Sequence, residues 1–134
     1  MPSDFRIFNP AELHKPMGYS HIAEITSGKL IYIAGQVAID PSGKIVGDGD
    51  FRAQVKQVFA NLAAALKAVG VDFHHVVKFN CYCVEKVDPE QMAIFREIRD
   101  LHVNTAHPPT STFVYVSRLV RPEWLIEVEA VAVV

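Results

Sequence analysis

The sequence predicts a single α+β domain in which two helices pack on one face of a mixed β-sheet. The chain has 134 residues, of which 50% are hydrophobic and 21% charged, which suits one sizeable core and argues against disorder. Apolar residues change along the chain from alternate spacing to three- and four-residue spacing, as strands and helices require. The resulting order has three strands, then two helix–strand units and a final strand, which favours a mixed sheet covered on one side.

The first third of the chain predicts three strands. Apolar residues alternate over residues 5–7 and, more weakly, over 19–26. Residues 30–34 form a nearly continuous apolar run between a turn and Gly35, which is typical of a buried strand.

Two helices are expected in the middle of the chain. The first runs from residue 51 to 69, with Asp50 as its N-cap and Gly70 after its end. The second begins at Asp88 and Pro89. Its expected buried stripe is Met92, Phe95, Ile98, Leu101 and His102 or Val103.

Three further strands are expected at residues 76–84, 111–118 and 125–133. In the first of these, alternation puts one set of residues on a common face, namely Val77, Phe79, Cys81 and Cys83. If both helices cover one face of the sheet, the strands carry more apolar surface than one layer of helices can cover. The residues that supply it are Val114, Val116, Ile126, Val128 and Val131. Exposed apolar sheet of this kind marks subunit interfaces, so we expect an oligomer.

Composition narrows the classes of partner. The net charge of −2 gives no basic surface for nucleic acid or an anionic membrane, and no apolar stretch is long enough to span a bilayer. Cys81 and Cys83 are too close along one strand for an ordinary disulfide and have no partners at metal-site spacing, so we expect reduced core thiols and no metal. No signal peptide is apparent in the first residues, and we expect a cytoplasmic protein.

A few polar residues are candidates for chemistry. Glu127 and Glu129 share one face of an otherwise apolar strand, where each is either a general base or water-orienting acid in a cleft, or half of a cross-strand or intersubunit ion pair with Lys or Arg. Arg118 and Arg121 near the last turn either bind a substrate carboxylate or pair with a local glutamate. Among the histidines, we retain His21 and His107 because they adjoin loops expected to border a cleft; structural roles remain open for both.

Several segments together resemble the RidA/YjgF family, the reactive-intermediate deaminases also called L-PSP endoribonucleases. The resemblance covers nearly the whole chain and is most specific near its C-terminus. The segments that carry it are 18–21 (GYSH), 30–37 (LIYIAGQV), 54–70, 76–78 (VVK), 109–114 (PTSTFV), 117–119 (SRL) and 125–132 (LIEVEAVA).

The resemblance implies a chorismate-mutase-like fold and a homotrimer with active sites in clefts between subunits. Family deaminases hydrolyse 2-imino or 2-enamino acids to 2-keto acids and ammonia, without a cofactor. By this resemblance Tyr19 lines the cleft, the Gly35 N–H helps to bind substrate, and Glu127 positions or activates water.

Four positions depart from the family pattern, one of them being Ile94 on the second helix, where the family has a polar residue, often asparagine. Ser111 stands where the family has its carboxylate-binding arginine, Ala34 replaces a serine, and Phe113 replaces a small residue, often cysteine. A hydroxyl lacks the charge of a guanidinium, so the first hypothesis is a cleft that binds a small neutral or apolar metabolite, with ordinary deamination altered or lost. The alternative is a deaminase that holds the carboxylate with Arg118 or Arg121. A ribonuclease is a third and weaker reading.

Overall fold

The computed structural model describes residues 4–134, so the expectation of no signal peptide rests partly on residues 1–3, which lie outside it. The elements follow the expected order. They are β1 (Phe5–Phe8), β2 (Ile22–Ile25), β3 (Leu30–Gln36), α1 (Phe51–Ala68), β4 (Val76–Val84), α2 (Met92–Asp100), β5 (Thr110–Val116) and β6 (Ile126–Val133), with short 3₁₀ turns at Phe73–His75 and Pro89–Gln91. No helix within the described residues is both long and apolar enough to cross a membrane.

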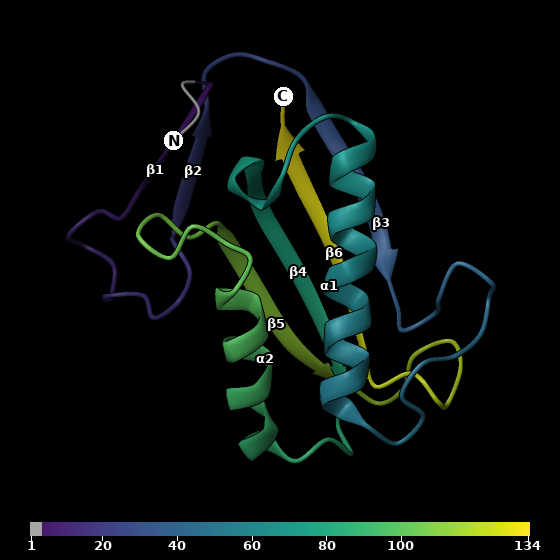
Figure 1. The fold of residues 1–134 in the computed structure, drawn as a ribbon. Helices are drawn as coiled ribbons and strands as arrows, with labels where there is room; N and C mark the ends of the chain where they lie inside the picture. Colours follow the sequence, from purple (N-terminus) through teal and green to yellow (C-terminus); the bar gives the residue numbers. More distant parts are fainter. Residues whose placement is uncertain (1–3) are drawn as a thin grey trace.

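The main sheet is mixed and has the strand order β3-β6-β4-β5. β6 runs antiparallel to both β3 and β4, whereas β4 and β5 are parallel. β1 and β2 form a separate antiparallel pair beside it (Figure 1). The expected α+β class with a mixed sheet is confirmed.

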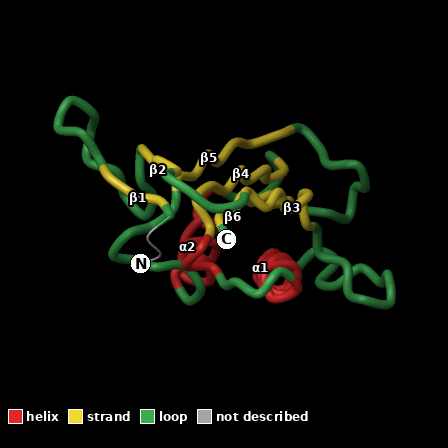
Figure 2. Tube along the Cα trace, turned by 90° about the horizontal axis from the view of Figure 1, so that it is seen from above, coloured by secondary structure: helices red, strands yellow, loops and turns green. Residues whose placement is uncertain are grey.

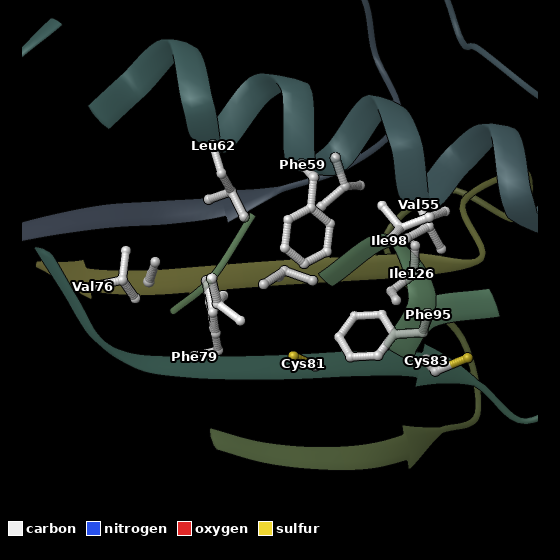
Figure 3. Packing of buried hydrophobic residues seen from close by; sticks show 14 of the residues in the cluster. Val55, Phe59, Leu62, Val76, Phe79, Cys81, Cys83, Phe95, Ile98 and Ile126 are labelled. Carbon is white, nitrogen blue, oxygen red and sulfur yellow. The ribbon is translucent and has the colours of Figure 1, made fainter. Parts of the chain in front are cut away.

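Both helices lie on the same face of the main sheet, as Figure 2 shows. The core fills the space between them, with Phe59 of α1 at its centre and Phe79, Cys81 and Cys83 of β4 below it (Figure 3). Phe59 is fully buried and its ring contacts those of Phe73, Phe79 and Phe95.

Local signals placed the helix ends correctly. The Asp50 carboxylate accepts a hydrogen bond from the Ala53 N–H and caps α1. Gly70 follows α1 with φ of +79°, a conformation that glycine adopts without strain. Asp88 caps the 3₁₀ turn that leads into α2, with Pro89 at its first position.

Three predictions about which way side chains face were wrong, two in β4 and after α2 and a third in β6. A β-bulge between Val76 and Lys78 shifts the register of β4, so Val76 enters the main core while Val77 packs with Phe5 and Val133 in a second cluster. Leu101 is 78% exposed because α2 ends at Asp100 and the following turn points it outward.

Ile126 and Val128 were expected to contribute to the uncovered face, but both are fully buried under the helices. The uncovered face instead mixes apolar and polar groups, including Tyr32, Asn80 and Glu129. It still carries exposed apolar side chains, with Tyr32 at 75% and Val114 at 41% exposure.

Candidate functional site

Glu127 lies on β6 and faces the uncovered side of the sheet, opposite Tyr82 of β4. Its carboxylate rests on the backbone of Gly35 in the neighbouring strand. A Cβ added to Gly35 would come within 2.1 Å of the Glu127 Oε2 atom. A register shift between Ile33 and Gln36 locally bends β3 at this place. Only a residue without a side chain therefore lets the carboxylate lie where it does.

The surroundings of Glu127 favour its protonated form. Partial burial raises the pKa of the Glu127 carboxyl, and the negative charge of Glu129 raises it further. Glu129 itself accepts a hydrogen bond from the Tyr82 hydroxyl. Within the described residues no Lys or Arg forms an ion pair with either glutamate, so the cross-strand ion pair weighed for them is not formed in this chain. A carboxylate whose pKa is shifted toward neutrality suits general base chemistry.

Ala34 is exposed at the edge of the sheet, next to Gly35. It borders a recess of about 590 Å³ on the uncovered face, which Lys78, Asn80 and Glu129 also line. We define Glu127, Ala34 and Gly35 as the glutamate group. The other expected site residues lie elsewhere.

Ser111 and Phe113 lie on β5, at the opposite edge of the main sheet. In the parallel β4–β5 register Ser111 pairs with Phe79 and Phe113 with Cys81, both of which face the helices. The Phe113 ring packs on Phe95 of α2, with 5.1 Å between ring centroids. Ser111 hydrogen-bonds to the Cys81 thiol, whose pKa burial raises to about 12. Cys81 is therefore a protonated core thiol and not a nucleophile at neutral pH.

Tyr19 lies near the same edge, because Ser20 pairs with Thr110 at the start of β5. Its hydroxyl lies 2.7 Å from Nε2 of His14, and His21 Nε2 lies 2.7 Å from the carbonyl oxygen of His14. Tyr19, His14 and His107 line a pocket of about 650 Å³ between the N-terminal loop and the loop before β5. We define Tyr19, Ser111 and Phe113 as the serine group.

Arg118 and Arg121 are not near Ser111. Arg118 follows the far end of β5, seven residues from Ser111, which corresponds to roughly 20 Å of extended chain. Its guanidinium donates to the carbonyls of Leu119 and Val120. Arg121 lies 3.7 Å from a carboxylate oxygen of Glu123 and above the Trp124 ring. Both are thus engaged in the loop between β5 and β6.

Sequence reasoning missed Arg99, which is a buried arginine beside Gly18 and Phe95. It is 8% exposed and lies on α2. The signal was present, since Arg99 follows Phe95 by four residues and therefore shares its helix face. The expected stripe treated that face as purely apolar: it included Ile98, which is buried as predicted, and left out Arg99.

The glutamate group and the serine group cannot meet within one chain. Glu127 on β6 lies two strand spacings, or roughly 10 Å, from β5, and Ala34 and Gly35 on the outer strand β3 lie three spacings, or roughly 14 Å, from it. The groups also face opposite sides, because Glu127 pairs with Tyr82 whereas Ser111 pairs with Phe79. A cleft that contains both needs one group from each of two chains.

Comparison with known proteins agrees with this arrangement of elements. The family model described as Endoribonuclease L-PSP matches residues 11–134. This chain belongs to the RidA/YjgF family.

Relatives of the RidA/YjgF family match along most of their length. The mouse 2-iminobutanoate/2-iminopropanoate deaminase is 33% identical, over 86% of this chain and 80% of its own. Protein DfrA of Myxococcus xanthus is 32% identical over 86% of this chain and 84% of its own. The crystal structure of the Rid family protein YyfB from Yersinia pestis superposes with a TM-score of 0.86 at 34% identity, covering 98% of this chain and 99% of that one.

Proposed function

We propose that this protein binds a small imine or enamine in a cleft between subunits and hydrolyses it to a carbonyl compound and ammonia, without a cofactor. The observation that carries the proposal is the Glu127 carboxylate, seated on the Gly35 backbone with a raised pKa. The name of the mouse relative supports the reaction class, since it is called an imine deaminase.

Hydrolysis of an imine requires the protein mainly to position a water molecule and to transfer protons. Water adds to the carbon of the C=N bond while Glu127 accepts one of its protons and passes it to the imine nitrogen, which gives a carbinolamine. Glu127 then takes the proton of the new hydroxyl group and transfers it to nitrogen, so that the C–N bond breaks and ammonia leaves as the carbonyl forms. One residue serves as base and then as acid, and a carboxyl whose pKa is raised above its ordinary value suits both steps.

The split site supports a ring of subunits. Pairing the β3 edge of one chain with the β5 edge of the next uses two different surfaces, and such heterologous contacts close into rings. We take this ring to be the homotrimer that the family resemblance implies, with the chorismate-mutase-like fold and one RidA/YjgF-like domain over residues 1–134. Tyr19, Ser111 and Phe113 of one chain would then face Glu127, Ala34 and Gly35 of its neighbour.

The replacements at Ser111, Phe113 and Ala34 favour a second candidate, a cleft that binds a metabolite without turnover. Measuring ammonia release from freshly generated 2-iminobutanoate and from an uncharged imine distinguishes the hydrolase from the binding protein. We expect acceleration over buffer and at least a 100-fold loss in Glu127→Gln. Acceleration that survives Glu127→Gln, or none with either imine, contradicts the hydrolytic role.

The cleft between subunits has its own test, which is subunit mixing. Glu127→Gln and Tyr19→Ala damage different groups, so each variant alone should be inactive. Hetero-oligomers formed by unfolding and refolding the mixture should regain activity, because some clefts then combine two intact halves. If mixing restores nothing although mass spectrometry shows hetero-oligomers, the site does not lie between subunits.

The remaining candidate, a ribonuclease, has no support beyond the family's historical name. The net charge of −2 does not favour binding to a phosphate backbone. Incubation with single-stranded RNA at low salt should give neither binding nor cleavage.

A further inference from the structure

Arg99 is a buried cation whose hydrogen-bonding capacity is largely unused. Its side chain is 10% exposed, and its Nε donates to Asp100 Oδ1 at 2.9 Å. A guanidinium carries five N–H donors. Among the described residues, none accepts a hydrogen bond from Nη1 or Nη2, the two nitrogens that form the end of the fork.

Such a group is unfavourable unless something completes it. Removing a charge from water costs several kcal/mol in proteins, and the cost is offset only when hydrogen bonds and an opposite charge replace the water. Asp100 offsets it in part, since its side chain is 46% exposed and contacts Nε alone. The Nη end of Arg99 is therefore suited to an anion that this chain does not itself supply.

The surroundings place this end beside the serine group. A Cβ at Gly18 would lie 2.4 Å from Nη2, so the fork packs directly under the backbone that precedes Tyr19. The Arg99 Cζ atom lies 5.9 Å from the centre of the Phe95 ring, which in turn contacts Phe113.

Two hydroxyl groups mark the same region. Ser111 hydrogen-bonds to Cys81, whose thiol also lies within the electrostatic reach of Arg99. Ser20, next to Tyr19 in sequence and paired with Thr110, is 2% exposed, and its Oγ has no partner among the described residues. Ser20 is thus a buried hydroxyl that no described residue satisfies, two residues after the Gly18 backbone that covers the Arg99 guanidinium, and both groups can bond to an anion.

We propose that Arg99 supplies from α2 the guanidinium that Ser111 no longer supplies from β5, and that it binds the carboxylate of a 2-imino or 2-enamino acid. The inference rests on the proposed function, because it names the substrate class of that cleft. A planar fork with two free nitrogens matches a carboxylate bidentately. A single buried positive charge suits a monoanion better than a phosphate dianion.

The test is direct binding of 2-oxobutanoate, the 2-keto acid that 2-iminobutanoate would yield, measured by calorimetry. We expect Arg99→Met, which keeps the length of the side chain but removes its charge, to weaken binding at least tenfold. Binding of the neutral analogue 2-oxobutanamide should change less than twofold. Arg96→Met removes a positive charge from the exposed side of the same helix and is the matched control, with unchanged binding.

Ammonia release tests the hydrolytic proposal and binding of 2-oxobutanoate tests the Arg99 proposal, so a failure of the one and a failure of the other give different results. Equal binding of 2-oxobutanoate by wild type and Arg99→Met overturns the inference, as does no binding by wild type at millimolar concentration. Equal losses for the acid and the amide would show a structural role, and a changed oligomeric state in Arg99→Met would show that Arg99 meets a carboxylate of another subunit instead.

If Arg99→Met does not fold, the wild-type protein still provides a test. The ¹⁵N resonances of the arginine side chains should show one guanidinium that shifts on adding 2-oxobutanoate and not on adding the amide. Segmental or selective labelling assigns it to Arg99. An unshifted Arg99 resonance at saturating 2-oxobutanoate rejects the proposal.

Discussion

Gly35→Ala is the sharpest test of how Glu127 is positioned. The new methyl carbon would lie 2.1 Å from Oε2, 2.8 Å from Cδ and 2.9 Å from Cγ of Glu127, whereas ordinary contact begins near 3.4 Å. The carboxylate must retreat by about 1.3 Å to relieve the Oε2 contact. Because the obstacle is the end of a flexible side chain, the backbone of β3 and β6 need not move.

A shift of this size matters more for catalysis than for folding. Misplacing a catalytic group by about 1 Å costs on the order of 100-fold in rate. We therefore expect ammonia release from 2-iminobutanoate to fall about 100-fold in Gly35→Ala, mainly in kcat. The midpoint of urea unfolding should change little, since the carboxylate is only partly buried.

A double-mutant cycle decides whether the effect passes through Glu127. In a Glu127→Gln background, Gly35→Ala should cost almost nothing further, because the group it displaces is already inactive. Shortening the side chain in Glu127→Asp makes room for the methyl group, so there too the added loss should be smaller. Full, independent losses in both backgrounds would refute the positioning argument and assign Gly35 a separate role.

Three other predictions concern stability. Phe59→Ala should lower the free energy of unfolding by about 3–5 kcal/mol in urea, because its buried ring lies at the centre of the core; a loss under 1 kcal/mol would contradict that packing. Gln54→Ala should cost about 1–3 kcal/mol, since it leaves the buried N–H of Leu125 without the acceptor it now has at 2.8 Å, and an unchanged unfolding midpoint would exclude this. The raised pKa of Glu127 means that the folded state holds its proton more tightly than the unfolded state, so stability should fall as pH rises above about 4.5, and Glu127→Gln should remove this decline; parallel pH curves for the two proteins would disprove it.

Much of the fold could be predicted because its signals are local. Helix α1 was predicted to within one residue from its apolar spacing, its cap at Asp50 and Gly70 after its end. Strand β4 was predicted with its observed ends. Alternation also predicted that Glu127 and Glu129 lie on one face of β6, and the pairing of these residues with Tyr82 and Asn80 of β4 confirms it.

The site depended on contacts between distant segments, which periodicity does not encode. The bulges at Val76 and at Ile33 change which residues face the helices, and they arise from pairing with β6 rather than from the strands' own sequence. The strand order and the opposite faces of β5 and β6 decide that Glu127 and Ser111 lie apart in one chain. The burial of Arg99 depends on Gly18, 81 residues earlier, folding over its guanidinium. The sequence alone thus determined the elements and the family, while only the tertiary structure, which sets the strand order and long-range packing, placed Glu127 against Gly35 and buried Arg99 beneath Gly18.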